Sequence, residues 1–579
     1  MCGIFGVCLH SINCVNGTNG KVKSHIPLLD VYCASKLLQH LELMYHRVLI
    51  YSFGSRHESL LSTSNQWQHD FPRAFGNQRF GVLSTDSRIN RNTTGRQISI
   101  PMCVVHNGEI YNCESLKTEY CSHIENRTTC DSEVIIQLYD KFQGAELCNL
   151  LDGVFAIVVI YDDDFFAARD PIGNFQQLNN EARRMQSRVA VPFTFMFEEH
   201  NDFVVYRSEM KAIQTFCANS LNVFPPGHYY TPLTGFVRYF EPLWMQPISH
   251  YTTDVFESLR ESLIAATHKR LKSDAPLAMM LSGGLDSSLI CAIAARELRR
   301  QNRPLRTFSI GLNEKSPDLI AARKQALSLL PHLIYHLESY DVTTLRASTP
   351  MYLLTKRISE EGIKTVLSGE GADEILGGYL YFSNAPTLEE FHQETVSRVC
   401  NLPYADVLRA DKACMANSVE IRVPFLDKRF LDVALRINPK TRFPTSRDAH
   451  SKPIEKWVLR KAFDNKDDPF LPEEVLYRQK EQFSDGVGYD WIDSLKAHAE
   501  EIVSDIELST ASSCFPLNTP KTKEAYLIRR IFAQRFPTEQ AAQTVKPWIP
   551  KWQDSEDPSG RYCNNHLQSH CLTTNGITK

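Results

Sequence analysis

The residues best suited to chemistry lie in one short run, 281–288, which reads Leu-Ser-Gly-Gly-Leu-Asp-Ser-Ser. An apolar run of the length of a buried strand, Leu277 to Leu281, precedes it, and apolar residues recur at helical spacing after it. A strand that turns through two glycines into a helix offers backbone N–H groups and a positive helix end to phosphate. Serine hydroxyls can donate to phosphate oxygens, and Asp286 can hold Mg²⁺. The run, which is neither a GxGxxG fingerprint nor a P-loop, therefore predicts a phosphate site. Its candidate residues are Ser282, Gly283, Gly284, Asp286, Ser287 and Ser288.

The elements that must position this run alternate between strand and helix. The pattern predicts helices over 254–272, 319–329 and 351–361, and strands over 306–312, 333–336 and 364–368. Such alternation is typical of a doubly wound parallel sheet, with ligands at the carboxyl ends of its strands. Asp318 and the acid-rich run 368–374 follow predicted strands, so we expect them at that edge. Beyond residue 390 the chain reads as mainly helical.

A second candidate site lies at the start of the chain. Removal of Met1 would leave Cys2 with a free α-amine. An α-amine has a pKa of about 7.7–8.0 and a thiol one of about 8.5, so the amine can serve as the local base. This is the N-terminal form of an activated nucleophile, which needs no histidine.

Two further segments fit the same chemistry. The strand-like Val104 to His106 leads into 107–112, Asn-Gly-Glu-Ile-Tyr-Asn, which we interpret as a turn presenting amide and carboxylate groups to a carboxamide amino acid. Asp131 is placed like the N-cap of the next helix and can also bind an α-ammonium. With strands predicted at 151–161 and 203–206, residues 1–215 read as a mixed α+β domain.

Composition excludes several classes of protein. The net charge of −4 and the lack of a basic run argue against nucleic-acid binding, and no stretch approaches a membrane span. The 16 cysteines include no C-x-x-C pair, which argues against a zinc site. Without a signal-like start we expect a cytoplasmic protein with reduced thiols. We divide the chain into an N-terminal domain over 1–215, a linker over 216–253, a second domain over 254–550 and a polar tail over 551–579.

An N-terminal Cys2 domain followed by Ser-Gly-Gly-Leu-Asp-Ser resembles the glutamine-hydrolysing asparagine synthetases. The resemblance covers about residues 254–490 and is carried by the segments 277–285, 316–319, 340–348, 368–379, 422–427 and 478–486, with 518–524 beyond them. It implies an N-terminal-nucleophile amidotransferase sandwich followed by an α/β ATP-pyrophosphatase-type domain with a helical C-terminal part. It also implies a homodimer that acts on small molecules.

For the second domain the resemblance implies that ATP and Mg²⁺ activate the side-chain carboxylate of aspartate as an adenylate, which ammonia then attacks. ATP contacts map onto the 282–288 loop and onto Leu281, Ile310, Ser368 and Gly369. Asp286 and Asp373 are the implied Mg²⁺ partners. Glu370 is implied in forming the adenylate, Lys480 in neutralising phosphate charge, and Arg346, with Thr343 and Thr344, in holding the aspartate carboxylates.

For the first domain the resemblance implies that Cys2 attacks glutamine, forms a thioester and releases ammonia into an internal tunnel. The implied glutamine contacts are Arg79, Phe80, Gly81, Val82, Leu83, Asn107, Gly108, Glu109 and Asp131.

The first domain also departs from the family pattern. A His-Arg-Gly-Pro-Asp turn is replaced by His46-Arg47-Val48-Leu49-Ile50, and an insertion of about 174–188 interrupts the segment after Gly173. A site loosened by about 1 Å can lose on the order of a hundredfold in rate. Two alternatives therefore stay open beside glutamine-driven asparagine synthesis: an ammonia-dependent synthetase with an impaired glutaminase, and a non-catalytic regulatory homologue. A different acceptor, as in a β-lactam-forming relative, is also open, although the 343–346 run favours aspartate.

Overall fold

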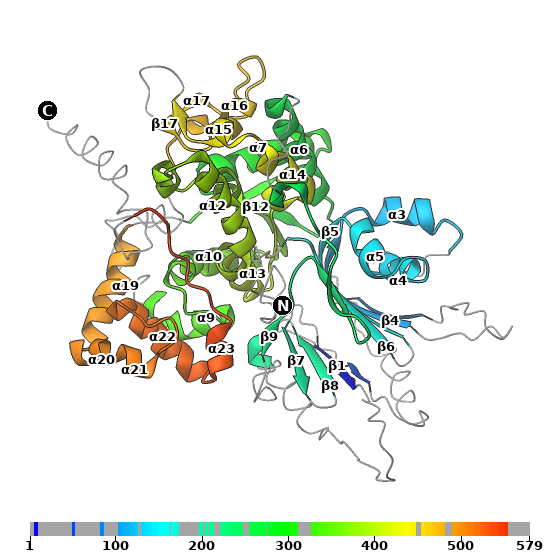
Figure 1. Ribbon diagram of the computed structural model, residues 1–579. Coiled ribbons are helices and arrows are strands. Elements are labelled where there is room, and N and C mark those ends of the chain that lie inside the picture. Colours follow the sequence, from blue (N-terminus) through cyan, green and yellow to red (C-terminus); the bar gives the residue numbers. More distant parts are fainter. Residues whose placement is uncertain are drawn as a thin grey trace, which may run out of the picture. The chain divides into compact units, whose positions relative to one another are not determined.

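The structure is a computed structural model of the 579-residue chain (Figure 1). It divides into two compact units, and Phe240 is the last residue of the first. No helix in the described ranges is long and apolar enough to cross a bilayer. The described residues are 5–9, 49–51, 81–85, 102–124, 128, 130–161, 164–172, 196–200, 203–207, 209–212, 221–246, 254–273, 275–310, 326–446, 453–480 and 489–553.

The first unit contains two sheets. The six-stranded sheet has the order β11-β10-β6-β5-β4-β3, and all its neighbouring strands run antiparallel. Its strands are β3 (Gly81–Thr85), β4 (Met102–Ile110), β5 (Gly153–Tyr161), β6 (Asp164–Arg169), β10 (His228–Thr231) and β11 (Gly235–Arg238). The five-stranded sheet has the order β2-β1-β8-β7-β9, from β1 (Phe5–Leu9), β2 (Leu49–Tyr51), β7 (Met196–His200), β8 (Phe203–Arg207) and β9 (Asn222–Val223).

Three helices pack on the six-stranded sheet: α3 (Cys113–Tyr120), α4 (Glu133–Tyr139) and α5 (Gly144–Leu150) (Figure 1). Alternate residues of the central strand β5, namely Phe155, Ile157 and Val159, enter one apolar core with α4 and α5. The period of two along a strand places these side chains on one face, so the helices cover that face.

The second unit is built on a four-stranded parallel sheet of order β13-β12-β14-β15. Its strands are β12 (Leu277–Met280), β13 (Arg306–Phe308), β14 (Thr365–Leu367) and β15 (Glu420–Arg422). From β12 the chain first passes to β13 on one side and later to β14 on the other. This reversal makes the carboxyl end of β12 a topological switch point, where open parallel sheets bind ligands.

Helices make up most of the rest of the second unit (Figure 1). Asp254 caps α6 by accepting from the backbone N–H groups of Phe256 and Glu257, and Asp341 caps α10 by accepting from that of Thr344. The longer helices are α6 (Val255–Arg270), α7 (Leu285–Arg300), α9 (Leu330–Leu337), α10 (Val342–Glu360), α12 (Leu388–Asn401), α13 (Asp406–Met415), α14 (Lys428–Arg436), α19 (Tyr489–Ile502) and α22 (Lys523–Arg535). The shorter elements are α11 (Ala372–Leu376), α15 (Pro439–Arg442), α16 (Trp457–Ala462), α17 (Glu473–Leu476), α20 (Asp505–Ser509), α21 (Ala511–Cys514), α23 (Glu539–Gln543) and the hairpin β16 (Thr445–Ser446) with β17 (Pro453–Ile454).

The predicted parallel sheet and the helices predicted over 254–272 and 351–361 are confirmed, with local corrections. Asp318 and most of the helix predicted over 319–329 lie outside the described residues. The strand predicted at 333–336 is wrong, because these residues lie in helix α9. Leu330, Leu333, Ile334 and Leu337 are all buried, which is helical spacing, and a four-residue apolar run does not distinguish the two structures. Helix α10 begins at Val342 rather than at the predicted Met351. It contains Pro350, and because proline usually interrupts a helix, the sequence did not predict the half that precedes it.

The first unit also extends beyond the predicted boundary at residue 215. The hairpin expected after Pro226 is present as β10 and β11, but it is not part of a linker. Strand β10 pairs with β6, with Tyr229 opposite Ala168 and Tyr230 opposite Ala167, so it extends the six-stranded sheet. The predicted insertion at 174–188 and the tail after Gln553 lie outside the described residues.

Candidate active site

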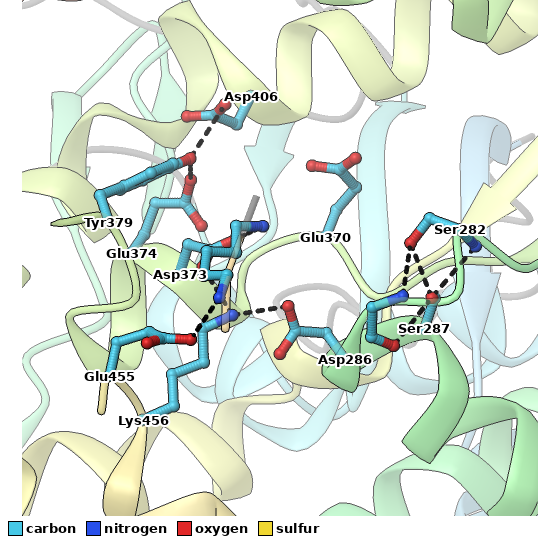
Figure 2. A network of polar contacts seen from close by, with 12 residues as sticks. Ser282, Asp286, Ser287, Glu370, Asp373, Glu374, Tyr379, Asp406, Glu455 and Lys456 are labelled. Carbon is cyan, nitrogen blue, oxygen red and sulfur yellow. Dashed lines mark hydrogen bonds and ion pairs between the residues drawn. The ribbon is translucent and has the colours of Figure 1, made fainter. Parts of the chain in front are cut away.

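The predicted phosphate loop has the expected strand–turn–helix geometry. It links β12 to α7, and Gly283 adopts a φ of +79°, a conformation that glycine reaches without strain. The Ser287 hydroxyl lies 2.9 Å from the Ser282 hydroxyl and accepts from the Ser282 backbone N–H at 3.2 Å. These contacts fold the loop back over the first turn of α7, as Figure 2 shows.

A second loop, from Ser368 to Gly371, follows β14 and meets the first. A Cβ added at Gly369 would lie 2.7 Å from the Ser287 backbone nitrogen, closer than real Cβ atoms come. Only a glycine therefore allows the two loops to touch. This contact brings Glu370 and Asp373 beside the phosphate loop. Asp373 lies in the first turn of α11, which begins at Ala372.

Two lysines neutralise the acids at this edge. The Lys456 ammonium lies 2.5 Å from a carboxylate oxygen of Asp286 and 2.5 Å from one of Asp373, and the Lys480 ammonium lies 2.6 Å from the other Asp373 oxygen. Figure 2 shows Lys456 reaching Asp286 from below the second loop. Burial opposes the charge of Asp373, but the two lysines outweigh it and lower its pKa to about 2.

Glu370 lies in a different electrostatic setting. Burial raises its pKa above the usual range, and Arg409 partly opposes this by donating a hydrogen bond to Glu370 at 2.6 Å. Arg409 also donates to Asp406 at 2.9 Å. The Tyr379 hydroxyl donates to Glu374 next to this pair, and burial together with the charges of Asp406 and Asp373 raises the pKa of Glu374 well above normal (Figure 2). A carboxyl with a raised pKa in a cleft is suited to proton transfer.

One cavity joins both groups of residues. It is lined by the following predicted site residues: Leu281, Ser282, Gly284, Asp286, Ser287, Ile310, Ser368, Gly369, Glu370, Asp373 and Lys480. The predicted residues Gly283 and Ser288 belong to the same loop but are not among the lining residues. The structure adds lining residues that the sequence reasoning missed: Tyr379, Asp406, Arg409, Glu455, Lys456 and Trp548.

Arg346, which is predicted to hold substrate carboxylates, pairs with an acid on another helix. Arg346 is buried, and its guanidinium donates to both carboxylate oxygens of Glu524, at 2.8 and 2.5 Å. It does not line the cavity, whereas Thr343, on the preceding turn of α10, does. A buried bidentate ion pair is costly to break, so Arg346 acts in the structure as a link between α10 and α22.

The structure describes only part of the predicted glutamine site. Cys2, Arg79 and Phe80 lie outside the described residues, and Gly81, Val82 and Leu83 form the backbone of β3. The segment 107–112, interpreted as a turn, is strand as far as Ile110, so Asn107, Gly108 and Glu109 continue β4 and pair with β5, and the turn is confined to Tyr111 and Asn112. Gly108 has a φ of +141° and leaves no room for a Cβ against the Val154 carbonyl, so glycine is required there.

Asp131 is fully buried, but it does not cap α4. One of its carboxylate oxygens accepts the Ile110 backbone N–H at 2.7 Å, which ties the start of α4 to the end of β4. Asn107, at 3 % exposed, and Glu109, at 8 %, lie on the same strand. This part of the first unit thus clusters the predicted amide and carboxylate groups, and their contact with glutamine stays a prediction.

A hydroxyl- and glycine-rich loop at the switch point of a parallel sheet, with carboxylates and lysines beside it, defines a nucleotide-binding α/β domain. Comparison with known proteins agrees. Residues 258–392 and 383–554 match the asparagine synthase family, and residues 89–189 match a glutamine amidotransferase domain.

Among similar proteins, a probable glutamine-hydrolysing asparagine synthetase of Schizosaccharomyces pombe is 45 % identical over 80 % of this chain and 86 % of its own length. A glutamine-hydrolysing asparagine synthetase of Zea mays is 43 % identical over 80 % and 82 %, and one of Arabidopsis thaliana is 44 % identical over 79 % and 82 %. The chain belongs to the asparagine synthase family. The match confirms the predicted succession of an amidotransferase domain and a synthetase domain.

Proposed function

We propose that this protein makes asparagine from aspartate with ATP, using glutamine as the nitrogen donor. The observation that carries the proposal is the strand-end cavity, in which a phosphate-type loop, two lysines and a carboxyl of raised pKa meet at the switch point of the sheet. The relatives named above are glutamine-hydrolysing asparagine synthetases by description.

In the proposed reaction, an oxygen of the aspartate side-chain carboxylate attacks the α-phosphorus of ATP, and pyrophosphate leaves. Ammonia then attacks the acyl carbon of the aspartyl-adenylate, and AMP leaves as asparagine forms. We assign the 282–288 loop to the phosphates, and Lys456 and Lys480 to the charge that develops on pyrophosphate. Glu370 takes the proton that the attacking nitrogen loses.

Asp286 and Asp373 fit a magnesium ion that is shared with ATP. No group of three or more metal-type side chains occurs in the described part of the chain, but magnesium at a nucleotide usually takes one or two carboxylates and completes its shell with phosphates and water. One buried oxygen of Asp286 has no hydrogen-bond partner among the described residues, which leaves it available as a ligand. A bound magnesium ion would supply charge neutralisation to the leaving pyrophosphate.

In the first unit, the Cys2 thiolate would attack the glutamine carboxamide, ammonia would leave, and water would hydrolyse the thioester to glutamate. We assign Arg79, Asn107, Gly108, Glu109 and Asp131 to glutamine binding. The homodimer and the ammonia tunnel are likewise proposals that rest on the family resemblance, and the cytoplasmic location is also a proposal.

One observation favours a second candidate, a synthetase that depends on free ammonia. Leu49 and Ile50, which stand where the family pattern has the Pro-Asp of its His-Arg-Gly-Pro-Asp turn, form part of strand β2, with Leu49 opposite Gly6 and Ile50 opposite Val7 of β1. A strand in place of a turn alters the backbone near the start of the chain, where Cys2 lies in sequence.

The test measures asparagine and AMP from ATP, magnesium and aspartate, with glutamine or ammonium chloride as donor, in wild type and Cys2→Ala. Activity with both donors in wild type, and with ammonium alone in the variant, supports glutamine-driven synthesis. Activity with ammonium alone in both proteins supports the second candidate. If neither donor yields AMP and asparagine, the proposed function is wrong.

A further inference from the structure

The C-terminal segment 544–553 forms part of the wall of the synthetase cavity. It is fixed to the second unit through its backbone: the Val545 carbonyl accepts from Asn518, the Trp548 backbone N–H donates to Asp341 at 2.7 Å, and the Ile549 carbonyl accepts from Arg398. Because these contacts flank Trp548 on both sides, they hold its side chain in one place.

The Trp548 indole is buried against aromatic and cationic neighbours. It is 6 % exposed, its ring lies 5.2 Å from that of Tyr379 in an edge-to-face arrangement, and the Arg398 guanidinium carbon lies 4.4 Å from its ring centre. Trp548 also lines the cavity. Neither of these contacts is a hydrogen bond from the indole N–H.

That N–H has no acceptor in the described part of the chain, although it is buried. Thr343 repeats the pattern, since it also lines the cavity and its buried hydroxyl has no partner among the described residues. Asp341 connects the two, because it caps the turn of α10 that carries Thr343 and accepts the Trp548 backbone N–H. Buried polar groups are nearly always hydrogen-bonded, so two unsatisfied donors on a cavity wall point to a ligand acceptor.

The acceptor belongs to the amino-acid end of the site. The Trp548 ring contacts Tyr379, whose hydroxyl joins the Glu374 and Asp406 carboxylates, and Asp406 shares Arg409 with Glu370. The phosphate loop is not part of this chain of contacts. A group bound here lies beside the acyl chemistry, whereas Arg346, which pairs with Glu524, does not line the cavity.

We propose that the Trp548 indole N–H donates a hydrogen bond to the α-carboxylate of the aspartate substrate, together with the hydroxyl of Thr343, for which the family resemblance already implies a contact with the aspartate carboxylates. The inference rests on the proposed function. The side-chain carboxylate reacts with ATP, so the α-carboxylate is the group that needs fixed donors elsewhere. Trp548 is then a specificity-determining residue supplied by the C-terminal segment, and it separates aspartate from substrates that lack this carboxylate.

The experiment compares wild type, Trp548→Phe and Trp552→Phe, with aspartate and with β-alanine, which is aspartate without its α-carboxylate. Phenylalanine keeps an aromatic ring but removes the N–H. Trp552 lies in the same segment, packs 6.2 Å from the Tyr381 ring and does not line the cavity, so it is the matched control. AMP release, the KM of each substrate and the thermal unfolding midpoint are measured.

We expect Trp548→Phe to raise the KM for aspartate by about 10- to 100-fold, the range for a hydrogen bond to a charged group. The KM for ATP and the kcat/KM for β-alanine should change by no more than about twofold, because only the α-carboxylate loses its donor. Thr343→Val, which removes the other donor, should show the same selectivity.

Equal losses with aspartate and β-alanine, a parallel rise in the KM for ATP, or an unchanged KM for aspartate would overturn the inference. If Trp548→Phe does not fold, Thr343→Val decides by the same criteria. A wild-type protein that releases no AMP with aspartate would reject the proposed function, whereas an active wild type with an unselective variant rejects this inference alone.

Discussion

Lys456 is a buried cation that two carboxylates of the site share. It is 1 % exposed and lies between the carboxylates of Asp286 and Asp373, while Lys480 holds the second oxygen of Asp373. Two lysines and two aspartates balance one another before the nucleotide binds. Under the proposed function, the phosphates of ATP would add negative charge and accept hydrogen bonds from the two lysines, while Asp286 and Asp373 would hold magnesium.

Replacing Lys456 by methionine should destabilise the second unit strongly. The change keeps the length of the side chain but leaves two carboxylates without their shared cation, and breaking a buried pair costs about 3–5 kcal/mol. Denaturant unfolding measures the loss. Lys461→Met is the control, because Lys461 is 46 % exposed on α16 and pairs with Asp464 at 3.5 Å, an interaction of about 0–1 kcal/mol. Equal losses in both variants would contradict this account.

Arg409 is predicted to set the acid limit of activity through Glu370. Burial raises the pKa of Glu370 and Arg409 lowers it, so removing Arg409 raises that pKa further. Glu370 accepts a proton only when it is ionised, so the acid limb of the pH–rate profile of Arg409→Met should move to higher pH. Because a general base contributes roughly 10²–10⁴-fold, we expect a fall of about tenfold or more in rate at pH 7.

The pH profile distinguishes electrostatics from simple damage. Arg409→Lys keeps a cation beside Glu370 and should return the acid limb toward the wild-type position. Asparagine formation is measured in both variants and wild type in the same buffers, so the titration of ammonia is common to all. A uniform loss at every pH, without movement of the acid limb, would rule out this role.

At the scale of elements, the site depends on two loops from neighbouring strands. The order β13-β12-β14-β15 places the end of β12 beside the end of β14, and the missing side chain at Gly369 lets their loops touch. Through this contact the phosphate loop on one strand and the acids on the next share one cavity. The strand order alone gives proximity, and the glycine gives contact.

Gly369→Ala should therefore impair nucleotide binding more than stability. The new methyl group would lie 2.7 Å from the Ser287 backbone nitrogen and push the phosphate loop away, and such overpacking costs about 1–3 kcal/mol. We expect a higher KM for ATP. Gly362→Ala is the control: its φ of +75° makes alanine cost about 1–2 kcal/mol, but its Cβ would meet open space. A KM for ATP that rises equally in both variants would show a general effect of destabilisation.

Local sequence patterns correctly predicted those elements whose geometry depends on residues that are adjacent in the chain. The strand, two glycines and helix around Ser282 form one continuous segment, so their geometry followed from spacing. Lys456 was missed because it follows an unremarkable Ile454-Glu455 and reaches Asp286 from 170 residues away in the chain. The pairing of Arg346 was missed for a related reason: its partner Glu524 lies 178 residues away in the chain. Pairings at this range depend on packing, which spacing does not encode.

At the scale of the whole molecule, the chain contains two units with separate hydrophobic cores. The core of the first unit is formed by β4, β5 and β6 with α3, α4 and α5, and an aromatic cluster in the second unit includes Tyr379, Phe391 and Trp548. The two proposed reactions are divided in the same way, with glutamine chemistry assigned to one unit and ATP chemistry to the other. Each ligand should therefore stabilise mainly the unit that binds it.

We expect calorimetry to separate these units by their ligands. A ligand at 100 times its dissociation constant stabilises the state that binds it by about 2.7 kcal/mol. ATP with magnesium should raise the temperature at which the second unit unfolds. Because Lys456→Met weakens the second unit, the transition whose temperature this variant lowers is the one that belongs to that unit. Glutamine added to Cys2→Ala, which cannot hydrolyse it, should raise the other transition.

Comparing the effects of both ligands on both unfolding transitions decides whether each unit binds its own ligand. If ATP and glutamine each raise a different transition, the two ligands bind different units, as proposed. If both ligands raise the same transition, or if glutamine raises neither while ammonium still supports asparagine formation, the first unit does not serve as a glutamine site. The latter result would agree with strand β2 (Leu49–Tyr51), which overlaps the segment 46–50 where the sequence departs from the expected turn, and would favour the ammonia-dependent synthetase.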